Sequence, residues 1–193
     1  MKSSDFFVDV ASRADLPAIM ELERGGFIAN IIEEESVFRS RFEIFPQGFL
    51  VLRDSAREKA WAYLATELWA ADPGSEREAF SLGHDPAPRF SASGTVLYTA
   101  SMTVAPELRG LGLGDRLFRE GRAHIVAGFP RIELELLIVN EHWRGARKIY
   151  EAAGFALRSV FSDFFAAERE AELYSGGRVG RAAAILMERR VPR

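Results

Sequence analysis

The stretch from Val104 to Gly114 joins an alternating apolar run to a helical pattern through a glycine-rich turn. Gly110 and Gly112 allow backbone conformations that other residues rarely adopt, and they let the main chain approach a ligand closely. A helix that begins after them would present unpaired N–H groups and the positive end of its dipole. The stretch therefore predicts a binding site for a phosphate or pyrophosphate, with the planar fork of donors on Arg109 beside it.

Two better-known phosphate loops do not match this stretch. A P-loop has Lys and then Ser or Thr after its last glycine, whereas an Asp and an Arg follow Gly114. The dinucleotide fingerprint needs a third glycine where this chain has Asp115 or Leu117, depending on which glycine pair opens the motif. A dinucleotide-binding domain is therefore the weakest alternative. What remains is an Arg-x-x-Gly-x-Gly pattern beginning at Arg109, directly after a strand-like run that ends at Val104.

Composition limits the class of protein. The chain has 193 residues, 48% of them hydrophobic and 27% charged, so we expect one domain over residues 1–193. A formal net charge of -3 gives no electrostatic argument for nucleic acid or an anionic membrane as partner. The absence of cysteine and the scattered positions of His84, His124 and His142 argue against a metal site. No apolar run is long enough for a membrane span or a signal core, so we expect a cytoplasmic protein.

Apolar periodicity predicts the order of strands and helices. Alternating or continuous apolar runs predict strands at residues 6–10, 49–53, 60–69, 95–104, 131–139, 155–165 and 182–191. Helical spacing predicts helices over about residues 15–26, 33–45, 113–128 and 146–153. The central run at 95–104 should place Val96, Tyr98, Ala100, Met102 and Val104 on one face. The long irregular connection at 71–93 could fold over a substrate.

This order of elements, together with two motifs, resembles the GCN5-related N-acetyltransferases. The second motif is Ile-Tyr-Glu-Ala-Ala-Gly-Phe at 149–155, a helical tyrosine followed by Gly-Phe, and it lies at a plausible distance from the first. The resemblance covers about residues 6–191, and its specific part is 94–155. It implies an α/β fold with a central mixed, twisted sheet of about seven strands flanked by about four helices, in which splayed parallel strands form the acyl-CoA site.

The resemblance implies acetyl-CoA as the cosubstrate and places its binding site. The residues at matching positions are Met102, Thr103, Val104, Arg109, Gly110, Leu111, Gly112, Leu113, Gly114 and Asn140. Asn140 is included because many members carry an Asn where this chain has Trp143, and Asn140 is the nearest one. Backbone N–H groups of 102–104 would hold the oxyanion, and Tyr150 stands at the position of the family's general acid.

An alkylamine acceptor with a pKa of about 10 must lose a proton before it can attack. Glu67, which lies among aromatic residues, is the first candidate for the base, with His84 and Tyr98 behind it. Glu67, His84 and Tyr150 each have a purely structural alternative. Glu67 could be a hydrogen-bonded residue of an edge strand, His84 a surface residue and Tyr150 a core tyrosine. The strand histidines of the arylalkylamine branch are absent, because Tyr98 and Ala100 occupy their positions.

The predicted function is transfer of an acetyl group from acetyl-CoA to a primary amine of a small molecule, by direct attack in a ternary complex. The connection around 81–86 resembles that of the arylalkylamine acetyltransferases. Phe27, Phe38 and Phe42 are candidates for an acceptor wall, or else core aromatics. Two alternatives stay open: a protein or peptide N-terminal or lysine acetyltransferase, and a non-catalytic acyl-CoA-binding module. A homodimer is also left open.

Overall fold

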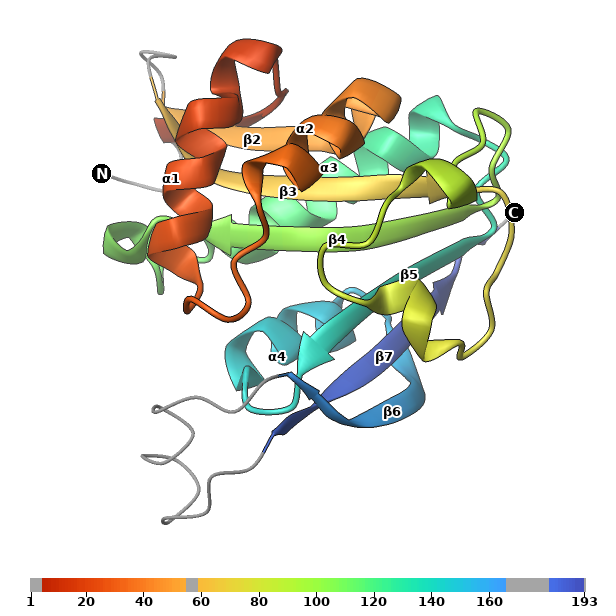
Figure 1. Cartoon of the computed structure of the whole chain (residues 1–193). Helices are drawn as coiled ribbons and strands as arrows, with labels where there is room; N and C mark the ends of the chain where they lie inside the picture. The colour runs from red at the N-terminus through yellow and green to blue at the C-terminus, as the bar shows by residue number, and fades with distance from the viewer. Residues whose placement is uncertain (1–4, 55–58, 166–180, 193) are drawn as a thin grey trace.

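The computed structural model describes residues 5–54, 59–165 and 181–192. Seven strands form one sheet in the order β1-β2-β3-β4-β5-β7-β6 (Figure 1). The strands are β1 (Phe6–Val10), β2 (Phe49–Asp54), β3 (Ala60–Trp69), β4 (Val96–Val104), β5 (Leu134–Asn140), β6 (Ala156–Phe165) and β7 (Ala182–Arg190). The pair β4 and β5 is parallel and the other neighbouring pairs are antiparallel.

In the part of the chain that the structure describes, four α-helices cover the two faces of this sheet. Helices α1 (Leu16–Gly26) and α2 (Glu35–Ile44) lie on one face, and α3 (Leu113–Gly128) and α4 (Arg144–Ala152) lie on the other (Figure 1). The strands β2 and β3 separate the two cores, because successive side chains point to opposite faces. Leu50 and Leu64 pack in the core of α3, whereas Phe49 and Tyr63 pack in the core of α1 and α2.

The sequence prediction of a mixed α/β sheet with seven strands and four helices is confirmed. Local signals account for the boundaries of α1, which has Pro17 in its first turn and ends at the glycine pair Gly25 and Gly26. The position of β7 between β5 and β6 was not predicted, since it depends on antiparallel pairing of β7 with both strands, one of which lies far away in the sequence. The turn expected after Asp54 and the polar segment at 166–180 lie outside the described residues.

The connection between β3 and β4 folds against the same face as α1 and α2. It contains two short 3-10 turns, η4 (Arg77–Phe80) and η5 (Ala87–Arg89). Phe80 is buried beside Trp69 and Tyr98, with ring centroids 5.6 Å from each. An isolated bridge between Trp69 and Phe90 fixes the other end of the connection. The segment expected to cover a substrate is therefore folded onto the sheet at both ends.

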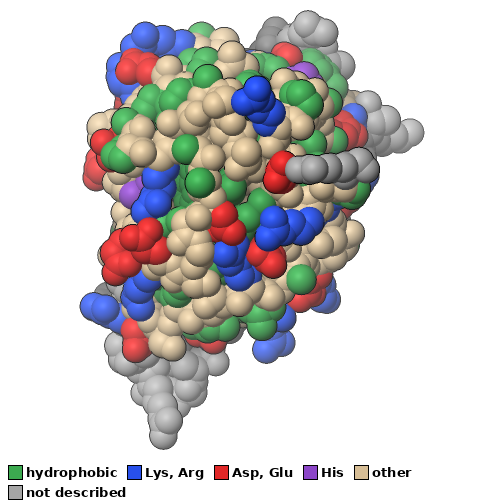
Figure 2. All heavy atoms as spheres, turned by 90° about the vertical axis from the view of Figure 1, so that its right-hand side faces the viewer, with side chains coloured by type: hydrophobic (Ala, Val, Ile, Leu, Met, Phe, Trp, Pro, Cys, Tyr) green, Lys and Arg blue, Asp and Glu red, His purple; other side chains and the backbone are tan. Residues whose placement is uncertain are grey.

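The described helices include none that is both long and apolar enough to cross a membrane. On the face shown in Figure 2, Lys and Arg side chains are interspersed with Asp and Glu side chains. Charges are also paired within α3, in the Arg116–Glu120 and Arg119–Asp115 pairs, both at 2.9 Å. This face therefore offers no continuous basic strip that could follow a phosphate backbone.

Candidate active site

A cavity opens where β4 and β5 separate. The two strands pair only from Val96 to Thr99 on β4, although β4 continues to Val104 and β5 to Asn140. The splayed ends, the start of α3 and parts of α1 and α4 enclose a cavity of about 590 Å³. This volume lies in the range of small-molecule and cofactor sites.

A β-bulge on β4 shapes the floor of the cavity. Ser101 pairs with Ala65 and Thr99 pairs with Thr66, so Ala100 is an extra residue with no partner on β3. The bulge reverses the alternation of the strand: Tyr98 packs on the side of the β3–β4 connection, whereas Met102 packs with the α3 core. The prediction that the alternate residues from 96 to 104 share one face is therefore wrong for Met102 and Val104, whereas Ala100 still packs with Val96 and Tyr98.

The bulge also directs backbone groups into the cavity. Ala105 N donates to Trp61 O on the β3 side. By the alternation of an antiparallel ladder, the N–H groups of Met102 and Val104 then point away from β3, towards the gap left by β5. Met102, Thr103 and Val104 all line the cavity. The N–H groups of Met102 and Val104 are therefore available to a ligand, as a bound thioester or pantetheine arm would require.

The glycine cradle, residues 109–114, forms the other end of the cavity. Gly110 and Gly112 have φ values of +81° and +75°, which L side chains rarely adopt. Gly112 is also the N-cap of α3, so the first N–H groups of the helix face the cavity without intrahelical partners. Leu113 and Gly114 line the cavity, whereas Leu111 is 46% exposed and lies outside it. The cradle fits a pyrophosphate, because it offers backbone donors and a positive helix end to an anion.

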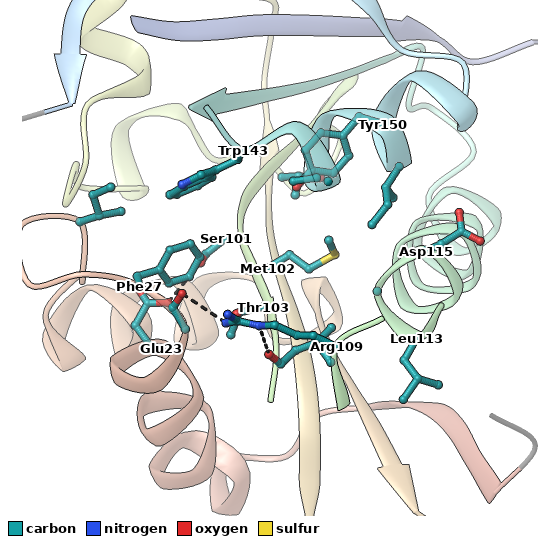
Figure 3. A pocket seen from close by; sticks show the side chains of 18 of the residues that line it. Glu23, Phe27, Ser101, Met102, Thr103, Arg109, Leu113, Asp115, Trp143 and Tyr150 are labelled. Carbon is teal, nitrogen blue, oxygen red and sulfur yellow. Dashed lines mark hydrogen bonds between the residues drawn. The ribbon is translucent and has the colours of Figure 1, made fainter. Parts of the chain in front are cut away.

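Arg109 lines the cavity and also forms two hydrogen bonds with backbone carbonyl groups. Its Nε donates to Val104 O at 3.2 Å and its Nη2 to Gly26 O at 3.4 Å (Figure 3). The guanidinium thus ties the cradle to the ends of β4 and α1 while its side chain also lines the cavity. The backbone of the cradle, more than this side chain, is free to receive phosphate.

Tyr150 projects from α4 into the cavity. Its ring contacts Phe118 and Phe155, with centroids 4.9 Å and 6.4 Å away, and burial raises the pKa of its hydroxyl above the ordinary value. A hydroxyl with a raised pKa stays protonated at neutral pH. The side chain of Tyr150 therefore lines the cavity in its protonated form.

Glu67 and Tyr98, the other predicted catalytic residues, do not line the cavity. Tyr98 is buried in a stack with Trp69, with centroids 4.4 Å apart. Glu67 is buried beneath the β3–β4 connection, where it accepts hydrogen bonds from Arg41, Trp69 and His84. Burial alone would raise its pKa, but the bond from His84 and the charge of Arg41 hold the pKa of Glu67 below its ordinary value. Glu67 is thus a buried ion-pair partner and a weak base.

Glu23 on α1 is one of three carboxylates that line the cavity, together with Glu33 and Asp115. It is 1% exposed, accepts hydrogen bonds from Ser101 Oγ at 3.3 Å and from Glu33 N at 3.2 Å, and also accepts one from Tyr63 Oη. Burial raises the pKa of Glu23 above its ordinary value despite the bond from Tyr63. The sequence carried a signal for it, because Glu23 follows Leu16, Ile19 and Met20 on the apolar stripe of the helix.

The end of the cavity away from the cradle, which we term the acceptor end, has mostly apolar walls. They are formed by Phe27, Ile31, Leu82, Ile138, Trp143 and Phe165. Phe27 and Trp143 approach from opposite sides, with ring centroids 5.4 Å apart, and Glu23 lies beside Phe27 (Figure 3). Of the three aromatics proposed for this wall, only Phe27 belongs to it, because Phe38 and Phe42 are buried between α2 and the sheet.

Asn140 does not line the cavity. It is buried, and its Oδ1 accepts a hydrogen bond from His142 N at 2.9 Å, which shapes the turn between β5 and α4. Trp143, three residues later, faces the cavity instead. The structure thus gives Asn140 the role of a turn residue.

Solved proteins share this architecture. The loading GNATL domain of CurA from Lyngbya majuscula aligns with a TM-score of 0.73 at 14% identity, over 96% of this chain and 97% of that one. A GNAT superfamily phosphinothricin acetyltransferase from Sinorhizobium meliloti, in complex with AcCoA, aligns with a TM-score of 0.66 at 18% identity, over 97% and 89%. The ribosomal-protein-S18-alanine N-acetyltransferase from Escherichia coli gives 0.64 at 17%, over 97% and 95%. No family model and no curated protein matches the sequence.

The splayed parallel strands, the bulge and the glycine cradle define an α/β protein with a cavity between β4 and β5. More particularly, the chain has the fold of the GCN5-related N-acetyltransferases, as its two motifs predicted.

Proposed function

We propose that this protein is an acetyl-CoA-dependent N-acetyltransferase. The observation that carries the proposal is the position of Glu23, a buried carboxylate in the same cavity as the glycine cradle and the bulge of β4. An acyltransferase needs these three features together: a site for the pyrophosphate, donors for the oxyanion and a base for the amine. The solved proteins with this fold include acetyltransferases for small molecules and for protein N-termini.

The chain's own groups suffice to hold the donor. The cradle and the start of α3 would bind the pyrophosphate, and the N–H groups of Met102 and Val104 would hold the arm and polarise the carbonyl. Gly145 and Ala146 of α4 line the opposite wall, where short side chains leave room for it. Acetyl-CoA would supply the acetyl group as a thioester.

Proton movement follows from the placement of two residues. Glu23 accepts the proton that the amine nitrogen loses as its bond to the acetyl carbon forms. Its raised pKa makes it a stronger base than an exposed carboxylate. Tyr150 lies on the α4 side of the cavity and donates a proton to the sulfur as the carbon–sulfur bond breaks. Transfer is direct, and no residue of the chain is acylated.

The acceptor in this proposal is a primary amine on a small molecule. Apolar side chains of Phe27, Leu82 and Phe165 close around the acceptor end, which favours a compact acceptor over an extended peptide. The rival acceptors are a protein N-terminus or a lysine. A non-catalytic module that binds acyl-CoA is the remaining alternative, since it would need the cradle alone.

The test combines cofactor binding with turnover. Acetyl-CoA bound only to the folded state must raise the thermal midpoint by mass action. We expect such stabilisation, and release of free CoA with at least one member of a panel of small amines, amino acids, polyamines and peptides. No stabilisation at millimolar acetyl-CoA would refute the binding site. Stabilisation without release would favour the binding module, and release with peptides alone would favour a protein substrate.

A further inference from the structure

Four charged side chains form a buried cluster next to the acceptor end: Glu33, Arg41, Glu67 and His84. Arg41 of α2 joins the two carboxylates, since it donates through Nη2 to Glu33 at 2.9 Å and through Nε to Glu67 at 2.6 Å. Arg41 is 2% exposed and Glu67 3% exposed. His84 completes the cluster from the β3–β4 connection, with its Nε2 2.9 Å from Glu67 Oε2. Burying so much charge is costly unless each group is paired.

The geometry fixes the charge of His84. Its Nδ1 lies 2.8 Å from the carbonyl oxygen of Ser81, and its Nε2 lies against the carboxylate of Glu67. Both partners only accept hydrogen bonds, so both ring nitrogens must carry a proton. The ring is then an imidazolium, and two positive charges balance two negative ones in the cluster. Burial would lower the pKa of His84, but the bond and charge of Glu67 raise it above its ordinary value of 6.5.

The cluster holds the tip of the β3–β4 connection in place. Gly83 N donates to Glu33 Oε1 at 2.6 Å, and His84 follows with its bond to Glu67. Leu82, the residue before them, lines the acceptor end although it is 39% exposed. Glu33 itself also lines the cavity. A side chain so exposed is held against the cavity less by its own packing than by these two polar bonds.

We propose that His84 is a positioning residue: its protonated ring, anchored through Glu67 and Arg41, holds Leu82 and Gly83 as the outer wall of the acceptor end. This inference rests on the proposed function, since it assigns the wall to acceptor binding. Loss of the Nε2 proton would turn a lone pair towards the Glu67 carboxylate and leave the cluster with one net negative charge. The wall would then loosen and the acceptor would bind more weakly.

The groups that face His84 come from four segments of the chain, and they decide whether the imidazole ring is charged at a given pH. Glu67 on β3 and the carbonyl oxygen of Ser81 favour the charged ring, and Arg41 on α2 opposes it. The rings of Trp69 and Tyr98 lie 6.2 Å and 6.1 Å from the imidazole and exclude water. The wall is therefore closed below the raised pKa of His84, and it opens as pH rises through that pKa.

The first test is the KM for the acceptor as a function of pH, from about pH 6 to about pH 9.5, which spans the titration of a histidine. In the His84→Gln variant we expect that KM to be raised about five- to tenfold below the transition, with little change in kcat or in the KM for acetyl-CoA. The KM values of wild type and His84→Gln should converge at high pH. Ionisation of the amine affects both proteins equally, so the ratio of the two KM values is independent of it. The control is His124→Gln, an exposed histidine on α3. Equal KM values for wild type and His84→Gln throughout would overturn the inference.

The second test needs no turnover. The measurement is amide hydrogen exchange of residues 81–85, corrected for the intrinsic effect of pH on the exchange rate. In the wild type we expect slow exchange at pH 6 and exchange about tenfold faster or more at high pH. In His84→Gln exchange should be fast at both pH values. Protection that is independent of pH, or unchanged by the substitution, would refute the positioning role. If no amine is acetylated, the proposed function fails, and the exchange measurement alone decides whether His84 holds this segment.

Discussion

At the scale of single residues, Glu23 shows how one cause can set both chemistry and stability. Burial raises its pKa, which makes it a better base but also makes its charged form unfavourable in the folded protein. A carboxyl group whose folded pKa is raised stabilises the fold below its ordinary value of 4.5, and this contribution is lost as pH rises through the folded pKa. The charged form of Glu23, which the proposed base role requires, therefore reduces the stability of the fold.

Replacing Glu23 with Gln should separate these effects. We expect kcat to fall by about 10² to 10⁴, the usual contribution of a general base. The unfolding free energy at neutral pH should rise or stay unchanged, because the buried charge is removed. Steady-state kinetics and chemical denaturation check both. Glu21→Gln, an exposed neighbour on α1, is the control. A variant that keeps more than a third or so of wild-type kcat would exclude Glu23 as the base.

The wild-type pH profile gives an independent check on Glu23. Because the base must be ionised, kcat/KM should fall as pH decreases through the pKa of this residue, which lies above 4.5. The acid limb should be absent from the residual activity of Glu23→Gln. An identical acid limb in both proteins would assign that ionisation to another group.

Removal of the Tyr150 hydroxyl tests whether this group is the proton donor. Tyr150→Phe keeps the ring contacts with Phe118 and Phe155, so the protein should fold with little change in thermal midpoint. We expect kcat to fall by about tenfold or more while the KM for acetyl-CoA changes little, because the proton donor is lost. Tyr98→Phe, a buried tyrosine outside the cavity, should keep full kcat. A loss of less than a few fold in Tyr150→Phe would argue against an acid role.

At the scale of elements, the glycine cradle depends on backbone conformation. Gly112 has a φ of +75° at the start of α3, and an added Cβ would meet no atom within 4 Å. The penalty for Gly112→Ala is therefore conformational, about 1 kcal/mol, and any relaxation moves the N–H groups of the cradle. We expect weaker binding of acetyl-CoA, measured by calorimetry. Gly128→Ala at the other end of the same helix should bind normally, since its backbone is not left-handed. Equal affinity in both variants would show that the cradle does not hold the phosphates.

Elements differ in how well the sequence predicted them. The cradle was predicted correctly because its conformation depends on glycines that are close together in the chain. The bulge at Ala100 was not, since no residue type marks it and its position depends on the register between β3 and β4. That one extra residue moved Tyr98 away from the cavity and turned Ser101 towards Glu23.

At the scale of the whole molecule, the buried charge cluster links α2, β3 and the β3–β4 connection, so its titration should affect global stability. Glu67 has a lowered pKa, so its contribution is present above pH 4.5 and is lost as pH falls through the folded value. His84 has a raised pKa, so its contribution is complete below pH 6.5 and is lost as pH rises through the folded value. Both contributions are fully present between those two pH values.

This window can be measured by denaturation at several pH values. The unfolding free energy of the wild type should exceed that of His84→Gln by about 1–2 kcal/mol between pH 4.5 and 6.5. The difference should shrink above the folded pKa of His84 as its proton is lost. A constant difference across the whole range would mean that the substitution disturbs packing alone, without a contribution from the charge.

The sequence by itself determined the order of elements, the glycine cradle and Tyr150, because hydrophobic periodicity, glycine conformation and the short helical motif are local properties. Only the tertiary structure decided which carboxylates line the cavity. Glu67 lay among aromatic residues in the sequence but is neutralised by Arg41, whereas Glu23, on an ordinary helix, reaches the cavity. The physical reason is that the basicity of a buried carboxylate depends on solvent exclusion and on neighbouring charges, and both come from segments far apart in the chain.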